Sequence, residues 1–469
     1  MELKQIFKVI FMKLNNFFIL FVILSCVISS SCKKFLSKKQ NASSVVPSKL
    51  SDLQALMDNG YSVYSVTPSY MEASSDEYFL SDDLYNSFYI NAQKIYTWAK
   101  FLSQEGSAND WGTVYNGVYY ANLVLDLIKD INRNEQNEGE WDNIKGSALL
   151  YRAYDFLNLL WNYAKAYDSN DGSNDYGIVL RMTSNFNEKS VRATNYDSYM
   201  QVIRDAKEAI PLLPDYPLIS LRPSKGAAYG LLARCYLSMR DYNSAKLYAD
   251  SCLQLYNRLI DFNEDEDIVG SIENSAPFIQ YNKETIFYSS MNSNYDIFTQ
   301  VGFIDTTILK LYEPGDLRLT AYFSDNGYGY KFFKASYSNN IYSNFTGIAT
   351  DEVLLIRAEC CIRTGEIQKG LNDINTLLVK RYKTGTFTDL KDLSASEALD
   401  RVLQERRKEL IMRGTRWMDI KRLNKEGRSI NLKRVIDHNT FSLEPNSNFY
   451  ALPLPDDLIT ISGIPPNEP

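Results

Sequence analysis

Few residues of the sequence could carry out catalytic or metal chemistry. The chain of 469 residues contains a single histidine, His438, which excludes metal sites built from two histidines, such as the H-E-x-x-H zinc site. Beyond residue 32 the cysteines show neither C-x-x-C nor another metal-ligand spacing, and they lie within apolar helical patterns, so we predict buried free thiols. These cysteines are Cys235, Cys252, Cys360 and Cys361.

Two groups of carboxylates remain as candidates for metal binding or hydrolysis. Residues 261–267 place side-chain oxygens at alternate positions, as a Ca²⁺ loop does, but Glu266 and Ile272 replace the glycine and the glutamate that such a loop requires. We therefore predict a solvated loop and no metal site. Asp82 and Asp83 could serve glycoside hydrolysis only at a defined carboxylate separation. An exposed turn, or a hydrogen bond to a ligand, is the favoured role for this pair.

The densest cluster of charges lies in residues 405–422. Glu405 and Glu409 share helical spacing with arginines, where opposite charges support each other, and Trp417 occupies a position typical of a core. We predict a structural role for this cluster. The sequence as a whole indicates no catalytic residues and no cofactor.

Tyrosine outnumbers phenylalanine, with 34 residues against 23, and the chain has 5 tryptophans. A tyrosine ring offers an apolar face and a hydrogen-bonding edge. Sugar rings pack on such faces, while their hydroxyls need polar side chains nearby. Tyrosines outside the helical patterns concentrate in residues 60–100 and 276–345, where we expect a ligand surface. The candidate ligand-binding residues are Asp82, Tyr85, Tyr89, Trp98, Asn294 and Tyr295, although ordinary packing is the alternative for each of them.

The overall composition excludes two further classes of protein. With 50 Lys+Arg against 57 Asp+Glu, the formal charge is −7, which argues against a dedicated nucleic-acid binder. At 45% hydrophobic and 23% charged residues, the chain can bury a large core and is not intrinsically disordered.

The N-terminus has the pattern of a lipoprotein signal peptide, which we place at residues 1–31. Lysines precede a 12-residue apolar run at residues 17–28, whereas a membrane-spanning helix needs about 20 such residues. Three serines then precede Cys32, so we expect the Cys32 thiol to be lipidated and to anchor the protein. Lipidation at Cys26, or cleavage to a soluble protein, remains as an alternative.

Apolar periodicity predicts a mainly helical chain. A tether rich in Lys, Ser and Asn covers residues 32–50, and we expect a single domain over residues 51–469. Helical periodicity is lost between residues 258 and 349, which indicates a loop-rich insertion with short strands. Residues 443–469 contain six prolines and suggest an extended tail. The long helices are expected at residues 109–129, 141–166, 196–213, 224–238, 242–257, 350–364, 367–381, 395–413 and 415–424.

Several helix pairs share the spacing of tetratricopeptide repeats. In the clearest pair, Tyr229, Leu232 and Tyr236 mark the first helix and Ala245 and Ala249 mark the second. One such pair cannot bury both of its faces, so the pairs must stack. We therefore predict an interrupted tetratricopeptide-repeat scaffold, with unrelated amphipathic helices as the alternative. The repeats occupy about residues 109–257 and 350–424.

These patterns together resemble the SusD/RagB family of outer-membrane nutrient-binding lipoproteins, over nearly the whole mature chain. The most specific match is the run GTRWMDIKR at residues 414–422, preceded by ERRKEL at residues 405–410. No single run is decisive, but their order and spacing agree with the family. Further matches are residues 32–36, Tyr115-Asn116 with Ala121-Asn122, Arg152-Ala153-Tyr154, residues 192–199, 225–228, 232–237, 352–358 and 452–455.

The resemblance implies a fold, a ligand and a partner. The fold is a SusD-like helical scaffold with a loop-rich subdomain that carries the ligand site. The ligand is an oligomeric nutrient, usually a glycan and sometimes a peptide, on which no chemistry is performed. The partner is a SusC-like TonB-dependent β-barrel transporter in the outer membrane, and no nucleic acid is involved. One departure concerns surface exposure, because Lys33 and Lys34 stand where acidic residues often favour export to the cell surface.

A second function from a different class remains open. A periplasmic scaffold could use tetratricopeptide grooves to bind protein partners. An enzyme acting through a carboxylate pair is a more remote third hypothesis.

Overall fold

The computed structural model describes residues 47–59, 66–99, 109–170, 172–292, 301–327 and 329–467. The predicted signal segment and Cys32 therefore lie outside the described residues, as do Asn294 and Tyr295. Lys49–Pro469 form one compact unit. Within the described ranges, no helix combines the length and the apolar character needed to cross a membrane.

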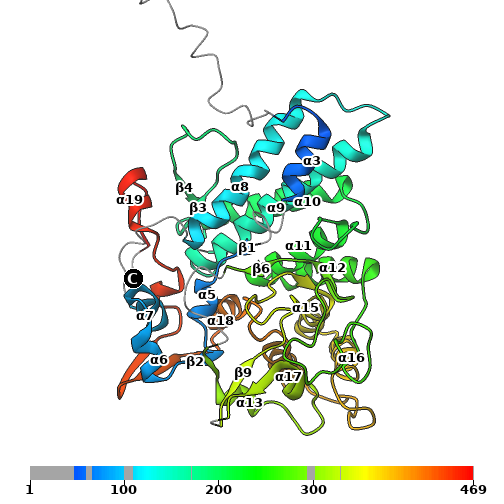
Figure 1. Cartoon of the computed structure of the whole chain (residues 1–469), viewed down its shortest axis with the longest axis vertical. Coiled ribbons are helices and arrows are strands. Elements are labelled where there is room, and N and C mark those ends of the chain that lie inside the picture. Colours follow the sequence, from blue (N-terminus) through cyan, green and yellow to red (C-terminus); the bar gives the residue numbers. More distant parts are fainter. Residues whose placement is uncertain are drawn as a thin grey trace, which may run out of the picture. The chain divides into compact units, whose positions relative to one another are not determined.

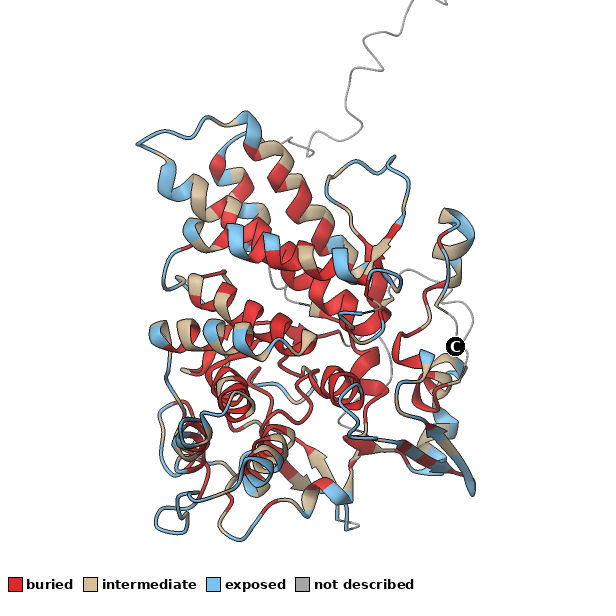
Figure 2. Cartoon of the chain, turned by 180° about the vertical axis from the view of Figure 1, so that it is seen from behind, coloured by how far each residue is buried: buried red, intermediate tan, exposed pale blue. Residues whose placement is uncertain are grey.

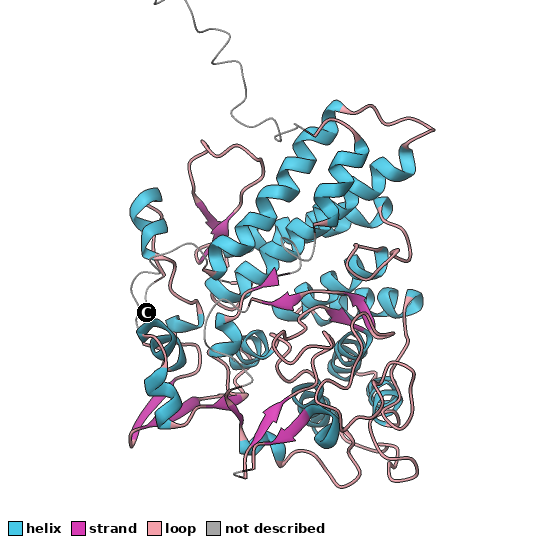
Figure 3. Ribbon diagram, in the orientation of Figure 1, coloured by secondary structure: helices cyan, strands magenta, loops and turns pink. Residues whose placement is uncertain are grey.

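The described unit is mainly helical, as expected, and its strands are short (Figure 3). Every long helix predicted from periodicity is present, with ends that differ by a few residues. The fold class predicted from the sequence is thus confirmed. The α-helices are α3 (Leu50–Asp58), α5 (Tyr70–Ala73), α6 (Asp82–Ser87), α7 (Ile90–Tyr96), α8 (Asp110–Leu127), α9 (Glu138–Tyr163), α10 (Asn195–Ala209), α11 (Lys225–Met239), α12 (Tyr242–Leu255), α13 (Thr306–Leu309), α14 (Arg318–Tyr322), α15 (Thr350–Arg363), α16 (Ile367–Leu378), α17 (Ala395–Glu409), α18 (Arg416–Asn424) and α19 (Asp456–Ser462).

Polar side chains define where these helices begin. Asn109 and Thr194 accept hydrogen bonds from backbone N–H groups in the first turns of α8 and α10, and Ser224 does so for α11. Ser394 and Glu397 form a reciprocal capping box at α17. Such caps satisfy N–H groups that have no partner within the helix, which explains the sharp starts.

The helices stack in sequence order, and each packs on the next (Figure 1). The series runs from α8 through α9, α10, α11 and α12 to α15 and α16, and α17 packs on both α15 and α16. Small residues allow the close approach, since Ala233, Ala245 and Ala249 are fully buried. A Cβ atom added at Gly230 would lie 2.7 Å from the side chain of Ile348. The buried residues lie on the facing sides of the stack (Figure 2).

The insertion at residues 258–349 separates a first helical block (residues 109–257) from a second one (residues 350–424). It is rich in loops and pairs with distant segments. It contributes strands that bond to the N-terminal region, in the pairs β1–β6 and β2–β7, and it pairs with its own last residues, directly before α15, in the pair β5–β10. Within the described residues, each sheet has two strands. The strands are β1 (Val66–Thr67), β2 (Tyr78–Phe79), β3 (Tyr176–Val179), β4 (Arg192–Thr194), β5 (Thr285–Phe287), β6 (Ser290–Met291), β7 (Phe303–Ile304), β8 (Phe323–Asp325), β9 (Lys331–Phe333), β10 (Ile348–Ala349), β11 (Leu432–Ile436) and β12 (Asn439–Leu443).

The C-terminal segment differs from the extended tail expected over residues 443–469. It contains a 3₁₀ turn at Asn448–Tyr450 and the helix α19. Pro455 precedes α19, Asp456 and Asp457 fill its first turn, and Gly463 ends it with a positive φ of 69°. Acidic residues at the start of a helix and a glycine after its end both favour the helix, so proline content alone was misleading.

A buried ion network joins the insertion to the second helical block. Arg318 donates to Asp316 and Glu405 at 2.7 Å and to Glu409 at 2.9 Å, and all four side chains are fully buried. Arg381, also fully buried, bonds Glu409 and Glu284 at 2.7 Å. These contacts support the structural role predicted for residues 405–422. We call Glu284, Asp316, Arg318, Arg381, Glu405, Lys408 and Glu409 the buried ion network.

We expect the substitution Arg318→Met to destabilise the fold strongly. It removes one cation from the buried carboxylates of Asp316, Glu405 and Glu409, and removing one partner of a buried ion pair typically costs about 3–5 kcal/mol. Urea unfolding measures the loss. The matched control is Arg133→Met, because Arg133 pairs with Asp142 at 2.8 Å on the surface, and such pairs contribute at most about 1 kcal/mol. Equal losses for the two variants would contradict a special role for the network.

The buried amine of Lys421 should make the free energy of unfolding depend on pH. Its Nζ donates to the carbonyl oxygens of Trp161 and Ala164 at the end of α9, and burial lowers the pKa of Lys421 to about 7. Below pH 7 the amine is charged in both the folded and the unfolded state. Between pH 7 and its usual pKa near 10.5, only the unfolded state keeps the proton, so this group makes the free energy of unfolding rise with pH.

The measurement compares wild type with Lys421→Met by urea unfolding at several pH values from 6 to 9. The difference in unfolding free energy should grow in favour of wild type by about 1.4 kcal/mol for each pH unit above 7. Lost hydrogen bonds to the two carbonyls shift the curve of the variant by a constant. Two curves that stay parallel across this range would show that Lys421 is not buried as a neutral amine.

Candidate functional site

The ligand residues expected in the N-terminal region lie in and beside two short helices. Asp82 and Tyr85 belong to α6, and Tyr89 directly precedes α7. Tyr89 is 77% exposed, and Asp82 accepts a hydrogen bond from the backbone N–H of Asp437 at 3.1 Å. Tyr85 is partly buried against Tyr96, with 5.8 Å between ring centroids. Only Tyr89 therefore offers an open ring face.

For Trp98 the structure agrees with ordinary packing, the alternative that the sequence left open for each candidate. Trp98 is only 8% exposed, its indole N–H donates to the carbonyl of Ser74, and its edge borders a cavity of about 230 Å³. Its ring and that of Tyr96 enclose the guanidinium of Arg434, at 5.0 and 3.5 Å from the ring centroids. Trp98 is buried because a cation in the interior prefers to lie against aromatic faces. The sequence could not show this contact, since Arg434 lies more than 300 residues further along the chain.

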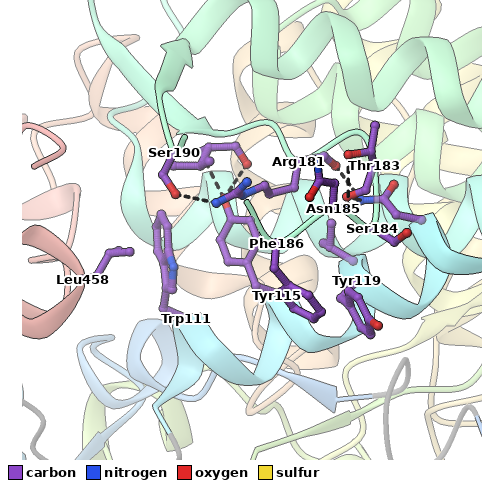
Figure 4. Close-up of a pocket in the computed structure, with 13 residues that line it drawn as sticks. Trp111, Tyr115, Tyr119, Arg181, Thr183, Ser184, Asn185, Phe186, Ser190 and Leu458 are labelled. Carbon is purple, nitrogen blue, oxygen red and sulfur yellow. Dashed lines mark hydrogen bonds between the residues drawn. The ribbon is translucent and has the colours of Figure 1, made fainter. Parts of the chain in front are cut away.

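A different place, which sequence reasoning missed, combines aromatic faces with polar edges. A cavity of about 220 Å³ lies between α8, the connection from β3 to β4, and α19 (Figure 4). We call it the aromatic pocket. It is lined by Trp111, Tyr115, Val118, Tyr119, Asn122, Val179, Arg181, Thr183, Ser184, Asn185, Phe186, Ser190 and Leu458.

Helix α8 supplies one wall of the aromatic pocket through its spacing. Trp111, Tyr115 and Tyr119 are four residues apart, so their side chains lie along one face of the helix. The rings of Trp111 and Tyr115 are 4.7 Å apart. Asn122 continues the same face with an amide. This spacing is visible in the sequence, but nothing in the sequence reveals what lies opposite it.

The opposite wall is the connection at residues 180–191, which is held by hydrogen bonds between its own residues. The guanidinium of Arg181 donates to the carbonyl of Glu188 at 2.6 Å and to the hydroxyl of Ser190 at 2.7 Å. The Thr183 hydroxyl donates to the Glu188 carboxylate at 2.7 Å. The connection therefore has a defined conformation although it contains no regular structure.

Side chains of α8 fix this connection in place. The Tyr115 hydroxyl donates to the carbonyl of Val179 at 2.7 Å and accepts its N–H at 3.0 Å. Burial raises the pKa of Tyr115, so the hydroxyl keeps its proton for this bond. The Asn122 amide donates to the carbonyl of Arg181 at 2.8 Å. One tyrosine and one asparagine thus hold both the start of the connection and the wall of the pocket.

A buried ion pair orients Asn122 in turn. Arg152 of α9 donates to the Asn122 carbonyl oxygen at 2.8 Å and to both carboxylate oxygens of Asp205 of α10, at 2.8 and 2.7 Å. This geometry fixes which end of the Asn122 amide faces the connection. The motif residues Arg152 and Asn122 therefore position the pocket, although neither was predicted as part of a site.

The exposed side of the aromatic pocket is formed by Phe186. This ring is 77% exposed and stacks on Tyr119, with 4.6 Å between centroids and 27° between planes. Figure 4 shows Phe186 reaching from the connection toward Tyr115 and Tyr119. An exposed aromatic side chain on a fixed loop, beside hydroxyl, amide and guanidinium groups, suits a ligand with apolar faces and polar edges.

The lining of the aromatic pocket favours binding over catalysis. It contains no Asp, Glu, His, Lys or Cys, so its serine and threonine hydroxyls have no carboxylate or imidazole base within the lining to activate them. Elsewhere, the carboxylates of Glu284, Asp351 and Glu409 come within 4.8 Å of one another and could in principle hold a metal ion. Arg381 and Arg413 already pair with them, so their charge is compensated by the protein.

Two family models match successive parts of the chain. Residues 34–237 match a SusD-like model described as starch-binding and associating with the outer membrane. Residues 285–460 match the model of the SusD family. A sequence search of curated proteins found no match.

Solved structures share the fold over nearly the whole chain. A SusD superfamily protein from Bacteroides thetaiotaomicron has a TM-score of 0.72 at 19% identity, covering 90% of this chain and 100% of that one. A putative sugar binding protein from Bacteroides vulgatus has a TM-score of 0.73 at 20% identity, covering 90% and 99%. A laminarin binding SusD-like protein has a TM-score of 0.64 at 17% identity, covering 89% and 98%.

Proposed function

The chain belongs to the SusD/RagB family of non-catalytic binding proteins, and from this premise we propose that it captures an oligosaccharide and delivers it to a SusC-like TonB-dependent transporter. The observation that carries the proposal is the aromatic pocket. Its ring faces come from α8 and Phe186, and its polar edges come from Arg181, Asn122 and several hydroxyls. The lining offers no carboxylate or histidine for hydrolysis, which suits capture and transfer.

A glycan fits the aromatic pocket better than a peptide does. Sugar rings present apolar C–H faces, and their hydroxyls both donate and accept hydrogen bonds. The mixture of serine, threonine, asparagine and arginine around aromatic rings matches these needs. The names of the structural neighbours agree with this choice, since one is described as sugar binding and another as laminarin binding.

The proposed location is the outer membrane, with lipid attachment at Cys32. The matching family model is described as associating with that membrane, which supports the location. In this arrangement residues 1–31 are removed, residues 32–50 form the tether and residues 51–469 form the binding domain. Asp82, Tyr85 and Tyr89, together with Asn294 and Tyr295, stay proposed as further ligand contacts.

Isothermal titration with the mature chain tests the ligand. We expect binding of maltooligosaccharides or laminarin oligosaccharides, and about tenfold weaker binding for Phe186→Ala, because one stacking contact of about 1.4 kcal/mol is lost. Thermal stability should not change, since this ring is exposed. Tyr342→Ala removes another exposed ring outside the pocket and serves as the control. Binding of peptides alone, or wild-type affinity of Phe186→Ala, would refute glycan capture at this pocket.

A test in cells addresses the anchor and the partner. Cys32→Ser should move the protein from the membrane fraction to the soluble fraction, whereas Cys26→Ser should not, because only one thiol receives the lipid. Wild type should co-purify with a β-barrel and be cleaved by protease added to intact cells. Protection from protease, without a barrel partner, would favour the periplasmic scaffold instead.

A further inference from the structure

A second and larger cavity lies away from the aromatic pocket and shares none of its residues. It has a volume of about 650 Å³, which is within the usual range of ligand sites. We call it the tyrosine cleft. It is formed by the loop between η2 (Ile210–Leu212) and α11, by the residues that follow α12, and by Tyr281. Its lining is Asp215, Tyr216, Pro217, Leu218, Ile219, Ser220, Ser224, Gly226, Leu255, Tyr256, Asn257, Arg258, Tyr281, Thr285 and Ile286.

The loop that forms one side of the tyrosine cleft is firmly anchored. The Ser220 hydroxyl donates to the carbonyl of Thr285 at 3.0 Å, and the Ser220 carbonyl accepts the N–H of Tyr288 at 2.8 Å. The Tyr151 hydroxyl donates to the carbonyl of Leu221 at 2.8 Å. Arg222 next to it makes two bonds to Asp58, at 2.8 and 2.7 Å.

The same loop nevertheless exposes apolar side chains. Leu218 is 80% exposed and Tyr216 is 59% exposed, although the Tyr216 hydroxyl is tied to the carbonyl of Leu255 at 2.9 Å. Apolar groups held in water by an otherwise fixed loop are not explained by packing within this unit. Because these side chains are already ordered, binding a ligand would cost less conformational entropy.

Tyr281 on the other side of the cleft adopts an unusual backbone conformation. Its φ of 59° lies in the left-handed region, which costs a bulky residue roughly 1–3 kcal/mol. The ring packs edge-on against Tyr288 at 4.9 Å and remains partly exposed at the cleft. Strain of this kind persists where the position of the side chain matters.

The edge of the cleft carries polar groups that suit a sugar. The guanidinium of Arg258 lies 5.9 Å from the ring centroid of Tyr256, and in the described part of the chain it forms no ion pair. Asp215 is compensated by Lys225 at 2.7 Å. The cleft thus offers one cation that has no ion-pair partner in the described residues, together with hydroxyls and an amide beside tyrosine faces.

We propose that the tyrosine cleft is a second oligosaccharide site, which rests on the proposed function of glycan capture. Ring faces pack on Tyr256 and Tyr281, and hydroxyl or carboxylate oxygens of the sugar accept from Arg258. A polymer that reaches both sites gains avidity, because the second contact is intramolecular once the first has formed.

The test combines Tyr281→Asn with Arg258→Ala, which we call the cleft variant. Asparagine tolerates a positive φ, so the backbone is kept while the ring is lost. Wild type, Phe186→Ala, the cleft variant and the Tyr342→Ala control are titrated with maltooligosaccharides, laminarin oligosaccharides and oligogalacturonates. Hydrogen exchange of the backbone locates the binding, at residues 214–224 for the cleft and at residues 180–191 for the aromatic pocket.

The expected result is that sugar slows exchange at residues 214–224 in wild type and in Phe186→Ala. The cleft variant should lose this protection and should bind the sugar about tenfold more weakly than wild type. A gain for oligogalacturonates over the neutral sugars would assign Arg258 to a carboxylate. Protection of residues 180–191 alone would overturn this inference and leave the proposed function intact. Binding of none of the sugars would overturn both. Protection of the cleft by the β-barrel but by no sugar would make it a protein-docking surface and would also overturn the inference.

Discussion

Burying charged side chains is costly unless each has a partner in exact register, and this constraint organises the whole fold. Arg318 in the insertion, Arg381 after α16, and Glu405 and Glu409 in α17 satisfy one another with no exposure to water. A shift of any one segment would leave a buried charge unpaired. The network therefore fixes how the loop-rich insertion sits on the second helical block, where apolar contacts alone would allow sliding.

The same device recurs in the first helical block, and there it reaches the candidate site. Arg152 pairs with Asp205 and thereby orients Asn122, whose amide holds the start of the connection at residues 180–191. Between the two blocks, Arg234 of α11 bonds Glu352 of α15 and carbonyl groups beside β10. One wall of the aromatic pocket is an irregular connection, and the buried Arg152 on α9 helps to hold it through Asn122.

The tyrosines divide by position into two groups with different physical roles. Tyr236 and Tyr248 stack within the repeat of α11 and α12, with 5.5 Å between centroids, and serve packing. Tyr119, Tyr216 and Tyr281 border cavities and keep part of each ring in contact with water. Stacking of polar ligands requires the second group, whereas the first holds the scaffold that presents it.

The sequence alone determined the helices, the repeat pattern, the family and the structural role of residues 405–422, because these follow from local periodicity, caps and short motifs. It did not reveal α19, since proline content outweighed the capping signals around residues 455–463. Only the tertiary structure shows which side chains border the candidate pockets. Trp98 is buried against Arg434, and Phe186 stacks on Tyr119 because α8 anchors the connection that carries Phe186. Both contacts join segments that are far apart in the chain, and no local sequence pattern specifies which distant side chain a residue will contact.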